Sequence, residues 1–295
     1  MQSDLRRETF MTKPAYIPRE TSPQREEGFG PFRVISVTSG KGGVGKSNIV
    51  VNLGLALARQ GLKVLLIDAD LGLGNLDILL GLAPKFTIQD VLDKQRDLTE
   101  VVVDGPEGLK ILPASSGIPE LAVLDESQKL FLLNEMDHYT DNIDVVLIDT
   151  GAGISHNVLF FNIAAQERIV VVNNQPPSIA DAYALIKVLA TQHNEKRFKI
   201  LINGLTHSRE AKSVYQTLVK VTDRFLGQEI SLDYLGLIPP DQAIPLAVMK
   251  QQPVLTLYPQ APASRSFVSL AQSLWESPRP SGIDGNIKLF WRRFV

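Results

Sequence analysis

Cysteine does not occur in the 295 residues of this chain. Its absence excludes disulfide scaffolds, Cys-ligated iron–sulfur clusters and cysteine nucleophiles. An excess of charge is lacking too, because 30 lysines and arginines oppose 32 aspartates and glutamates, for a formal net charge of −2. That balance gives no overall attraction to nucleic acid, so we expect no specific nucleic-acid partner.

Long apolar runs and a secretory signal are also missing. No apolar stretch approaches the roughly 18 residues that a membrane-spanning helix needs. The N-terminus lacks a basic region followed by an apolar one. We therefore expect a cytoplasmic protein. The length of 295 residues fits one large domain or two small ones.

Glycine, in contrast, is concentrated in one informative stretch. Residues 40–47 read GKGGVGKS, which fits the phosphate-binding pattern G-x-x-x-x-G-K-[ST]. Glycines let the backbone curl so that N–H groups converge on an anion, and a following helix adds its positive N-terminal end. We expect Lys46 to reach the β- and γ-phosphates of a nucleotide and Ser47 to coordinate Mg²⁺. The predicted phosphate-contacting residues are Gly40, Gly42, Gly43, Val44, Gly45, Lys46, Ser47 and Asn48.

Short apolar runs alternate with amphipathic stretches from Phe32 onward. We predict strands over residues 34–38, 63–68, 109–112, 144–149, 168–173, 198–203 and 232–238. Helices are predicted over residues 47–59, 127–139, 178–192, 210–225 and 263–275. This alternation predicts a mostly parallel sheet with helices on both faces, which is the three-layer α/β architecture of P-loop NTPases.

Three aspartates follow predicted strands, at the edge of the sheet where ligands bind in such folds. Asp68 and Asp70 come at the end of one strand, and Asp149 ends another. We expect Asp149 to contact Mg²⁺ directly or through water, Asp70 to orient the attacking water, and Asp68 to lie at the same metal site. The alternative for each aspartate is a helix N-cap or a turn residue.

Two further features concern the nucleotide itself. Lys41 lies five residues before Lys46, on the outer side of the loop, and its spacing leaves open whether it reaches its own phosphates or those of a second subunit. The N-K-x-D signature of guanine-specific enzymes is absent. Asn203, at the end of a predicted strand, can hydrogen-bond an adenine, so ATP is favoured over GTP.

With these residues in view, the sequence resembles a known group. The stretch KGGVGKS, with Lys41 as an extra lysine, is similar to the deviant Walker A motif of the MinD/ParA ATPases. Residues 68–77 (DADLGLGNLD) resemble the switch I segment of that group, and residues 149–154 (DTGAGI) resemble its switch II. Segments 178–187, 221–226, 232–236 and 251–259 resemble the flagellar-number regulators of the group, the FlhG (FleN) subfamily.

The resemblance implies a homodimer that forms with ATP and Mg²⁺. In it Lys41 would contact the ATP of the partner subunit, and Asn203 would bind adenine with Pro239 nearby. The resemblance also implies three kinds of protein partner: a signal-recognition-type (SRP) GTPase of the FlhF type, flagellar switch-ring (C-ring) proteins, and a flagellar transcription activator.

The two ends of the chain differ in composition from the body. Residues 1–31 hold four prolines and mixed charge, which predicts a flexible arm before an ATPase domain over residues 32–277. Residues 278–282 (PRPSG) predict a linker, after which apolar residues at helical spacing with basic neighbours predict an amphipathic helix that binds an anionic membrane. The predicted membrane-contacting residues are Ile283, Ile287, Lys288, Phe290, Trp291, Arg292 and Phe294. The alternative is a tail that packs on its own domain.

Together these features predict an ATPase that is slow without an activator, associates reversibly with the cytoplasmic face of the inner membrane, and regulates flagellar number and placement. Other functions remain open at this point. They are a ParA-like DNA-partitioning ATPase, a MinD-type division-site selector and a structural adaptor with an inactive site.

Overall fold

The computed structural model describes residues 32–114, 123–139, 143–279 and 288–289. The predicted N-terminal arm lies outside these ranges, and so do most residues of the predicted amphipathic helix: Ile283, Ile287, Phe290, Trp291, Arg292 and Phe294. Among the described helices, none combines the length and the apolar character needed to cross a membrane.

Eight strands form a single sheet in which all neighbouring pairs are parallel except β3 with β4. This arrangement confirms the predicted mostly parallel sheet. In spatial order the strands are β3 (Val103–Asp104), β4 (Lys110–Leu112), β2 (Val64–Ala69), β5 (Val145–Ala152), β1 (Arg33–Ser39), β6 (Glu167–Val172), β7 (Arg197–Asn203) and β8 (Ser231–Ile238).

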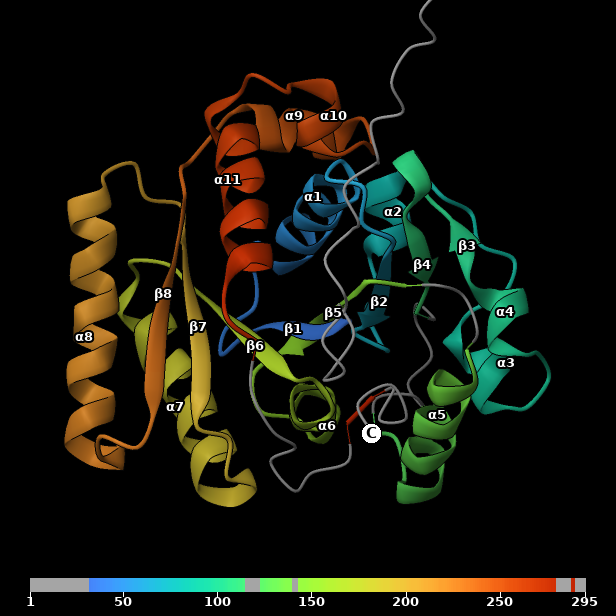
Figure 1. The fold of residues 1–295 in the computed structure, drawn as a ribbon, viewed down its shortest axis with the longest axis horizontal. Coiled ribbons are helices and arrows are strands. Elements are labelled where there is room, and N and C mark those ends of the chain that lie inside the picture. The colour runs from blue at the N-terminus through green and yellow to red at the C-terminus, as the bar shows by residue number, and fades with distance from the viewer. Residues whose placement is uncertain (1–31, 115–122, 140–142, 280–287, 290–295) are drawn as a thin grey trace, which may run out of the picture.

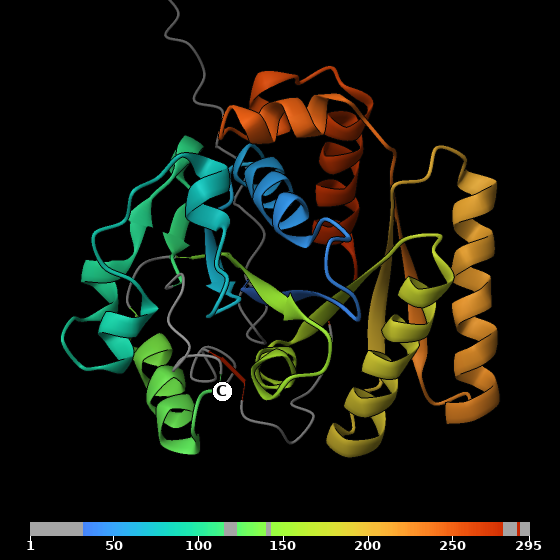
Figure 2. The ribbon, with the colours of Figure 1, turned by 180° about the vertical axis from the view of Figure 1, so that it is seen from behind.

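Helices cover both faces of the sheet, so the fold has the three predicted layers (Figures 1 and 2). One face packs against α1 (Lys46–Ala58), α2 (Leu76–Leu80), α9 (Ala243–Met249), α10 (Val254–Leu257) and α11 (Pro262–Glu276). The other packs against α3 (Ile88–Leu92), α4 (Leu98–Val101), α5 (Glu126–His138), α6 (His156–Ala164), α7 (Pro176–His193) and α8 (Ser208–Leu226). A 3₁₀ turn, η1 (Pro106–Gly108), joins β3 to β4.

The apolar strand runs explain why both faces are covered. Successive side chains of a strand point to opposite faces, and in β1 Val34 joins the core under α5 and α6 while Ile35 joins the core under α1 and α11. Every residue of β1 is buried, because β1 lies between β5 and β6 in the middle of the sheet. β1 is therefore an inner strand of the sheet that is covered on both faces.

A buried ion pair fastens the start of β1 to its surroundings. The Arg33 guanidinium donates from Nε and Nη2 to the two carboxylate oxygens of Glu167, the first residue of β6, at 2.7 and 2.6 Å. Its Nη1 donates to the carbonyl oxygens of Leu274 and Trp275 in the last turn of α11. Arg33 therefore joins two strands and satisfies carbonyl groups that a helix end leaves free.

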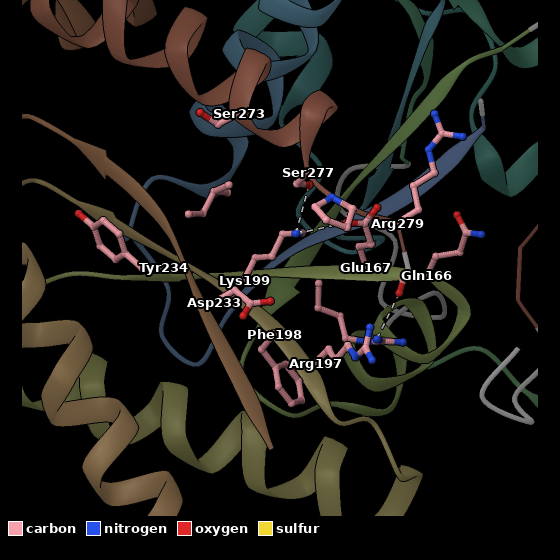
Figure 3. Close-up of a pocket in the computed structure, with 13 residues that line it drawn as sticks. Gln166, Glu167, Arg197, Phe198, Lys199, Asp233, Tyr234, Ser273, Ser277 and Arg279 are labelled. Atoms are coloured by element: carbon pink, nitrogen blue, oxygen red, sulfur yellow. Dashed lines mark hydrogen bonds and ion pairs between the residues drawn. The ribbon is translucent and has the colours of Figure 1, made fainter. Parts of the chain in front are cut away.

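A groove of about 540 Å³ lies at this end of the sheet, between β6, β7, β8 and the end of α11 (Figure 3). Within it, Lys199 lies between Ser277 and Glu167, with its Nζ 3.4 Å from Ser277 Oγ and 3.6 Å from Glu167 Oε2. The buried Glu167 carboxylate is thus compensated by Arg33 and Lys199. We interpret these charges as structural, because they balance one another at the end of the sheet opposite the phosphate loop.

Replacing Arg33 with methionine should lower the free energy of unfolding by about 3–5 kcal/mol, because Glu167 would remain buried without its main partner. Urea denaturation measures this change. The matched control is Arg96→Met, which breaks the exposed Arg96–Glu100 pair and should cost about 0.5 kcal/mol or less. Equal losses in the two variants would show that the buried pair contributes no more than a surface pair.

Candidate functional site

The GKGGVGKS stretch forms the loop between β1 and α1, as its pattern predicts. Gly43 and Gly45 adopt φ values of 77° and 95°, a left-handed region that favours glycine. A Cβ atom on Gly40 would lie 2.1 Å from the backbone of Asp181 in α7, so only glycine fits there. The loop therefore needs glycine both for its curvature and for its close contact with a neighbouring helix.

A hollow of about 620 Å³ opens beside this loop. Seven of the predicted site residues line it: Gly42, Gly43, Gly45, Lys46, Ser47, Asn48 and Asp70. Switch II contributes Gly151 and Ala152 to the same hollow. The other predicted site residues do not line it: Gly40, Lys41, Val44, Asp68, Asp149, Asn203 and Pro239.

Asp149 lies in the second half of β5, which continues to Ala152. Parallel pairing aligns it with Val37 of β1 on one side and Asp68 of β2 on the other. The carboxylate is 2% exposed, accepts a hydrogen bond from the Ser47 hydroxyl, and is attracted by Lys46. Its Oδ1 is buried and has no hydrogen-bond partner among the described residues. A buried acceptor beside Ser47 fits the predicted Mg²⁺ contact.

Carboxylates alone do not make a metal site here. No group of three or more His, Cys, Asp or Glu side chains in the described ranges could hold a metal ion. Mg²⁺ ordinarily takes one or two protein ligands and completes its shell with substrate phosphates and water. Ser47 and Asp149 fit that pattern, and Lys46 stands beside them with its side chain largely buried.

Asp68 makes backbone contacts that the sequence did not indicate. It is 1% exposed, and its two oxygens accept backbone N–H groups from Asp70 at 3.2 Å, Asn75 at 2.8 Å and Leu76 at 3.0 Å. These bonds hold the switch I segment against the end of β2. Asp68 therefore supports switch I, and its expected place at the metal site stays a prediction.

Burial shifts the pKa values of Asp149, Asp68 and Lys46. Burial and the negative charge of Asp68 raise the pKa of Asp149 to about 8, although Ser47 and Lys46 oppose the rise. Burial raises the pKa of Asp68 to about 6 against three backbone hydrogen bonds. Burial also lowers the pKa of Lys46, against the attraction of Asp149 and Asp70. Near neutral pH the carboxylate pair thus retains a proton that a bound cation would displace.

Asp70 is the carboxylate that faces the hollow. It stands close to switch II, because a Cβ atom on Gly151 would lie 3.4 Å from Asp70 Oδ1. The predicted role of Asp70 in orienting a water molecule stays a prediction. The structure brings Lys46, Ser47 and Asp70 to one hollow, with Asp149 beneath them.

Lys41 extends away from the hollow toward α7. Its Nζ donates to Gln175 Oε1 at 2.9 Å in an exposed hydrogen bond, and Gln175 is the residue at the N-cap position of α7. Ser39 Oγ donates to the Lys41 carbonyl oxygen at 2.7 Å and fixes the backbone at this point. The Lys41 side chain is thus half-buried beside the site, and its hydrogen bond to Gln175 is exposed. Sequence spacing gave no sign of Gln175, which lies 134 residues away.

Asn203 and Pro239 come together beside the loop, at the ends of β7 and β8. Asn203 pairs in register with Ile238, and Pro239 follows directly. The Asn203 amide is not free, however: its Nδ2 donates to the Val44 carbonyl oxygen at 2.7 Å. Asn203 therefore holds the phosphate loop from behind, a contact that the expected adenine role did not include.

Lys288 is placed differently from the exposed, membrane-facing position that we expected. It is 6% exposed, and its Nζ donates to Glu195 Oε1 at 2.9 Å and to the Ile163 carbonyl oxygen at 2.8 Å. Glu195 also binds Arg168 at 2.6 Å, and Leu289 N donates to Ala164 O at 2.8 Å. In this arrangement residues 288–289 pack on the domain, as the alternative interpretation predicted. Glu195 has no sequence signal that would have identified it.

Helix α6 connects this contact to the nucleotide site. It begins directly after switch II, where Ser155 caps its N-terminus. In its C-terminal half, Asn162 accepts a hydrogen bond from Ser36 Oγ at 2.9 Å and donates one to Thr38 Oγ1 at 3.1 Å, both on β1. Its last carbonyl groups accept from Lys288 and Leu289. No helix was predicted over these residues.

The fold and the site define a P-loop nucleotide-binding protein with an additional lysine in its loop. A family described as an AAA domain matches residues 32–202, more than half of the chain. The chain therefore belongs to this family and is a MinD/ParA-type ATPase.

Within this family, the chain is similar in sequence to two flagellar proteins. The chain is 44% identical to the antiactivator FleN of Pseudomonas aeruginosa over 90% of this chain and 94% of that protein. It is 29% identical to the flagellum site-determining protein YlxH of Helicobacter pylori, over 90% of each.

Two solved structures share the fold. MinD in the MinC:MinD cell-division complex of Aquifex aeolicus matches with a TM-score of 0.67 and 30% identity, over 85% of this chain and 98% of that one. MinD of Pyrococcus horikoshii, solved with Mg-ADP, matches with a TM-score of 0.66 and 24% identity, over 82% and 96%.

The carboxylate pair predicts a pH dependence of stability in the absence of Mg²⁺. The folded pKa values of about 6 and 8 lie above the ordinary value near 3.9. Between about pH 4 and 8 the folded state therefore binds more protons than the unfolded state, so stability falls as the pH rises. Urea denaturation at pH 5 and pH 8 should show this loss, and Asp149→Asn should reduce it.

Asp125→Asn provides the control, because Asp125 is the exposed N-cap of α5. The backbone N–H of Gln128 lowers the pKa of Asp125, so its contribution is present at neutral pH and is lost only as the pH falls below about 4. The control should leave the difference between pH 5 and pH 8 unchanged. An Asp149→Asn protein with the wild-type difference would contradict the assignment.

Proposed function

We propose that this protein is a dimerising, membrane-associating ATPase that regulates flagellar number and placement. The observation that carries the proposal is the 44% identity to FleN over nearly the whole length of both chains, together with Lys41 in the phosphate loop. Similarity to YlxH, a flagellum site-determining protein, supports the flagellar part.

The bound species is ATP with Mg²⁺. The loop N–H groups and Lys46 hold the phosphates, and Ser47 with Asp149 holds the cation, whose charge stabilises the phosphates during transfer. MinD of Pyrococcus horikoshii was solved with Mg-ADP, which supports this choice. We expect Asn203 and Pro239, at the ends of β7 and β8 beside the loop, to lie near the base.

Hydrolysis of ATP to ADP and phosphate depends on Asp70. Its carboxylate faces the hollow and is free of the backbone bonds that occupy Asp68. It orients the attacking water, while Lys46 stabilises the charge that develops on the transferred phosphoryl group. We expect a slow reaction in the isolated protein, because one lysine supplies most of the positive charge.

In the proposed dimer, Lys41 contacts the nucleotide of the partner subunit. Lys41 is half-buried beside the site, and its ammonium group donates to the neutral amide of Gln175, a bond that it exchanges for the nucleotide of the partner subunit. A charge-assisted bond to phosphate is stronger than a bond to a neutral amide. The homodimer is therefore favoured only when ATP is present.

Lys41→Ala should weaken the ATP-dependent dimer by about 10- to 100-fold, because each subunit loses a hydrogen bond to a charged group. Light scattering with Mg-ATP measures the effect, and Lys187→Ala, an exposed lysine on α7, is the control. In cells that lack the gene, the wild type and the control should restore flagellar number and position, while Lys41→Ala should not. Unchanged flagella after deletion would contradict the flagellar function.

Membrane association is reversible and uses the C-terminal segment. In the described state Lys288 is held by Glu195 and Leu289 is fully buried, so these two residues are not available to a bilayer. We infer that ATP-dependent dimerisation releases them, and that two copies in one dimer bind an anionic surface more tightly than one. The protein then alternates between the cytoplasm and the cytoplasmic face of the inner membrane.

Co-sedimentation with anionic liposomes tests this step. The full chain should pellet with ATP and much less with ADP, and a chain that ends at Ser281 should pellet in neither state. Glu195→Gln should raise binding in ADP, because the neutral amide holds Lys288 less firmly. Glu210→Gln on the exposed side of α8 is its control. Equal pelleting of the full and shortened chains would remove the segment from the proposal.

The proposed protein partners are an FlhF-type GTPase, switch-ring proteins and a flagellar transcription activator. Aquifex MinD was solved in complex with MinC, which supports a partner-binding role for the fold. A DNA-partitioning function would instead require ATP-dependent duplex binding that falls steeply with salt.

A further inference from the structure

Asn203 makes a contact that its expected role in adenine binding does not explain. Its Nδ2 donates to the carbonyl oxygen of Val44, the residue before the last glycine of the phosphate loop, at 2.7 Å. The two residues lie 159 positions apart in the chain. Because the acceptor is a carbonyl oxygen, the NH₂ group of the amide must face the loop.

This contact is tightly packed as well as polar. A Cβ atom on Gly45 would lie 2.6 Å from Asn203 Nδ2, so the asparagine fills the space that any other residue at position 45 would need. Gly45 also has a φ of 95° and forms the N-cap of α1. Asn203 thus stands against the backbone at the point where the loop turns into the helix.

Asn203 is itself held in place. It is the last residue of β7, which pairs with β6 on one side and with β8 on the other. Its register partner is Ile238, and the next residue, Gly204, donates its N–H to Ile238 O at 2.9 Å. The amide therefore reaches the loop from a rigid strand end.

The direction of the Val44 carbonyl decides the direction of a neighbouring N–H group. The described chain has no cis peptide bond, and in a trans peptide unit the C=O and the following N–H point in opposite directions. When Asn203 holds Val44 O, the N–H of Gly45 is turned to the other side of the loop. Gly45 lines the hollow beside the loop, and Asn203 does not.

We propose that Asn203 is a positioning residue for the phosphate loop, which orients the Gly45 N–H toward the phosphates independently of the base. This inference rests on the proposed nucleotide-binding function and assigns one element of that site. Loss of the amide leaves the Val44–Gly45 peptide free to rotate, so every ligand with phosphates binds less well, whether or not it carries adenine.

The experiment compares a nucleotide with a ligand that has phosphates and no base. Calorimetry measures the binding of Mg-ADP and of inorganic tripolyphosphate with Mg²⁺ to the full chain. Asn203→Ala should weaken both by the same factor, about 3- to 10-fold for a neutral hydrogen bond. Asn203→Asp should weaken both further, because a carboxylate oxygen would face the Val44 carbonyl. Asn134→Ala on exposed α5 is the matched control.

A loss confined to Mg-ADP, with tripolyphosphate binding unchanged, would overturn the proposal and leave Asn203 with adenine recognition alone. Amide hydrogen exchange in the ligand-free protein separates local from general effects. Asn203→Ala should accelerate exchange at residues 43–47 and leave residues 34–38 of β1 unchanged, whereas acceleration in both would overturn the proposal. If the wild type binds neither ligand, the nucleotide function is wrong, and the exchange comparison still decides the role of Asn203.

Discussion

Backbone pairing between β1 and its parallel neighbours β5 and β6 determines where the groups of the nucleotide site lie. The register aligns Val37 with Asp149, and Asp149 with Asp68 on the next strand. A shift of one residue would turn each carboxylate to the opposite face of the sheet. The loop that follows β1, Ser47 at the start of α1 and the two switch segments meet because these strands end at the same edge.

Buried charges are paired at one end of the sheet and incompletely paired at the other. At the ends where β1, β6 and β7 begin, Arg33 and Lys199 balance Glu167, and Arg168 with Lys288 balances Glu195. At the carboxyl ends, Asp68 and Asp149 lie side by side with Lys46 nearby, and Asp149 Oδ1 has no partner in the described ranges. Balanced charges stabilise one end, and the unbalanced carboxylates of the other end suit a cation.

The sequence was sufficient for the parts of the fold that depend on local pattern. Apolar runs of about five to seven residues predicted the long strands, because a strand covered on both faces is apolar throughout. The loop was evident from its glycines. Helix α6 was missed, because the apolar stretch from Val158 to Ala164 has no clear polar face: it is packed between the sheet and α5 and α7. Short helices such as α3 and α9 lack enough turns to show a period.

The parts of the site that escaped prediction are contacts between distant segments. Gln175 holds Lys41, Glu195 holds Lys288, and Asn203 holds Val44, over separations of 134, 93 and 159 residues. Residue type alone suggested a free lysine or a free amide in each case. A single sequence contains the donors but not their partners, since tertiary packing brings the partners together.

Helix α6 makes contacts near the nucleotide site at one end and with residues 288–289 at the other, so it can couple the two regions energetically. Its N-terminus follows switch II, its Asn162 is bound to β1, and its C-terminal carbonyls accept Lys288 and Leu289. Coupling between two sites is reciprocal in free energy. To the extent that a ligand at switch II loosens residues 288–289, any agent that captures those residues must strengthen the binding of that ligand by the same factor. A partner that binds the C-terminal segment would then act as an effector of the nucleotide site without contacting that site.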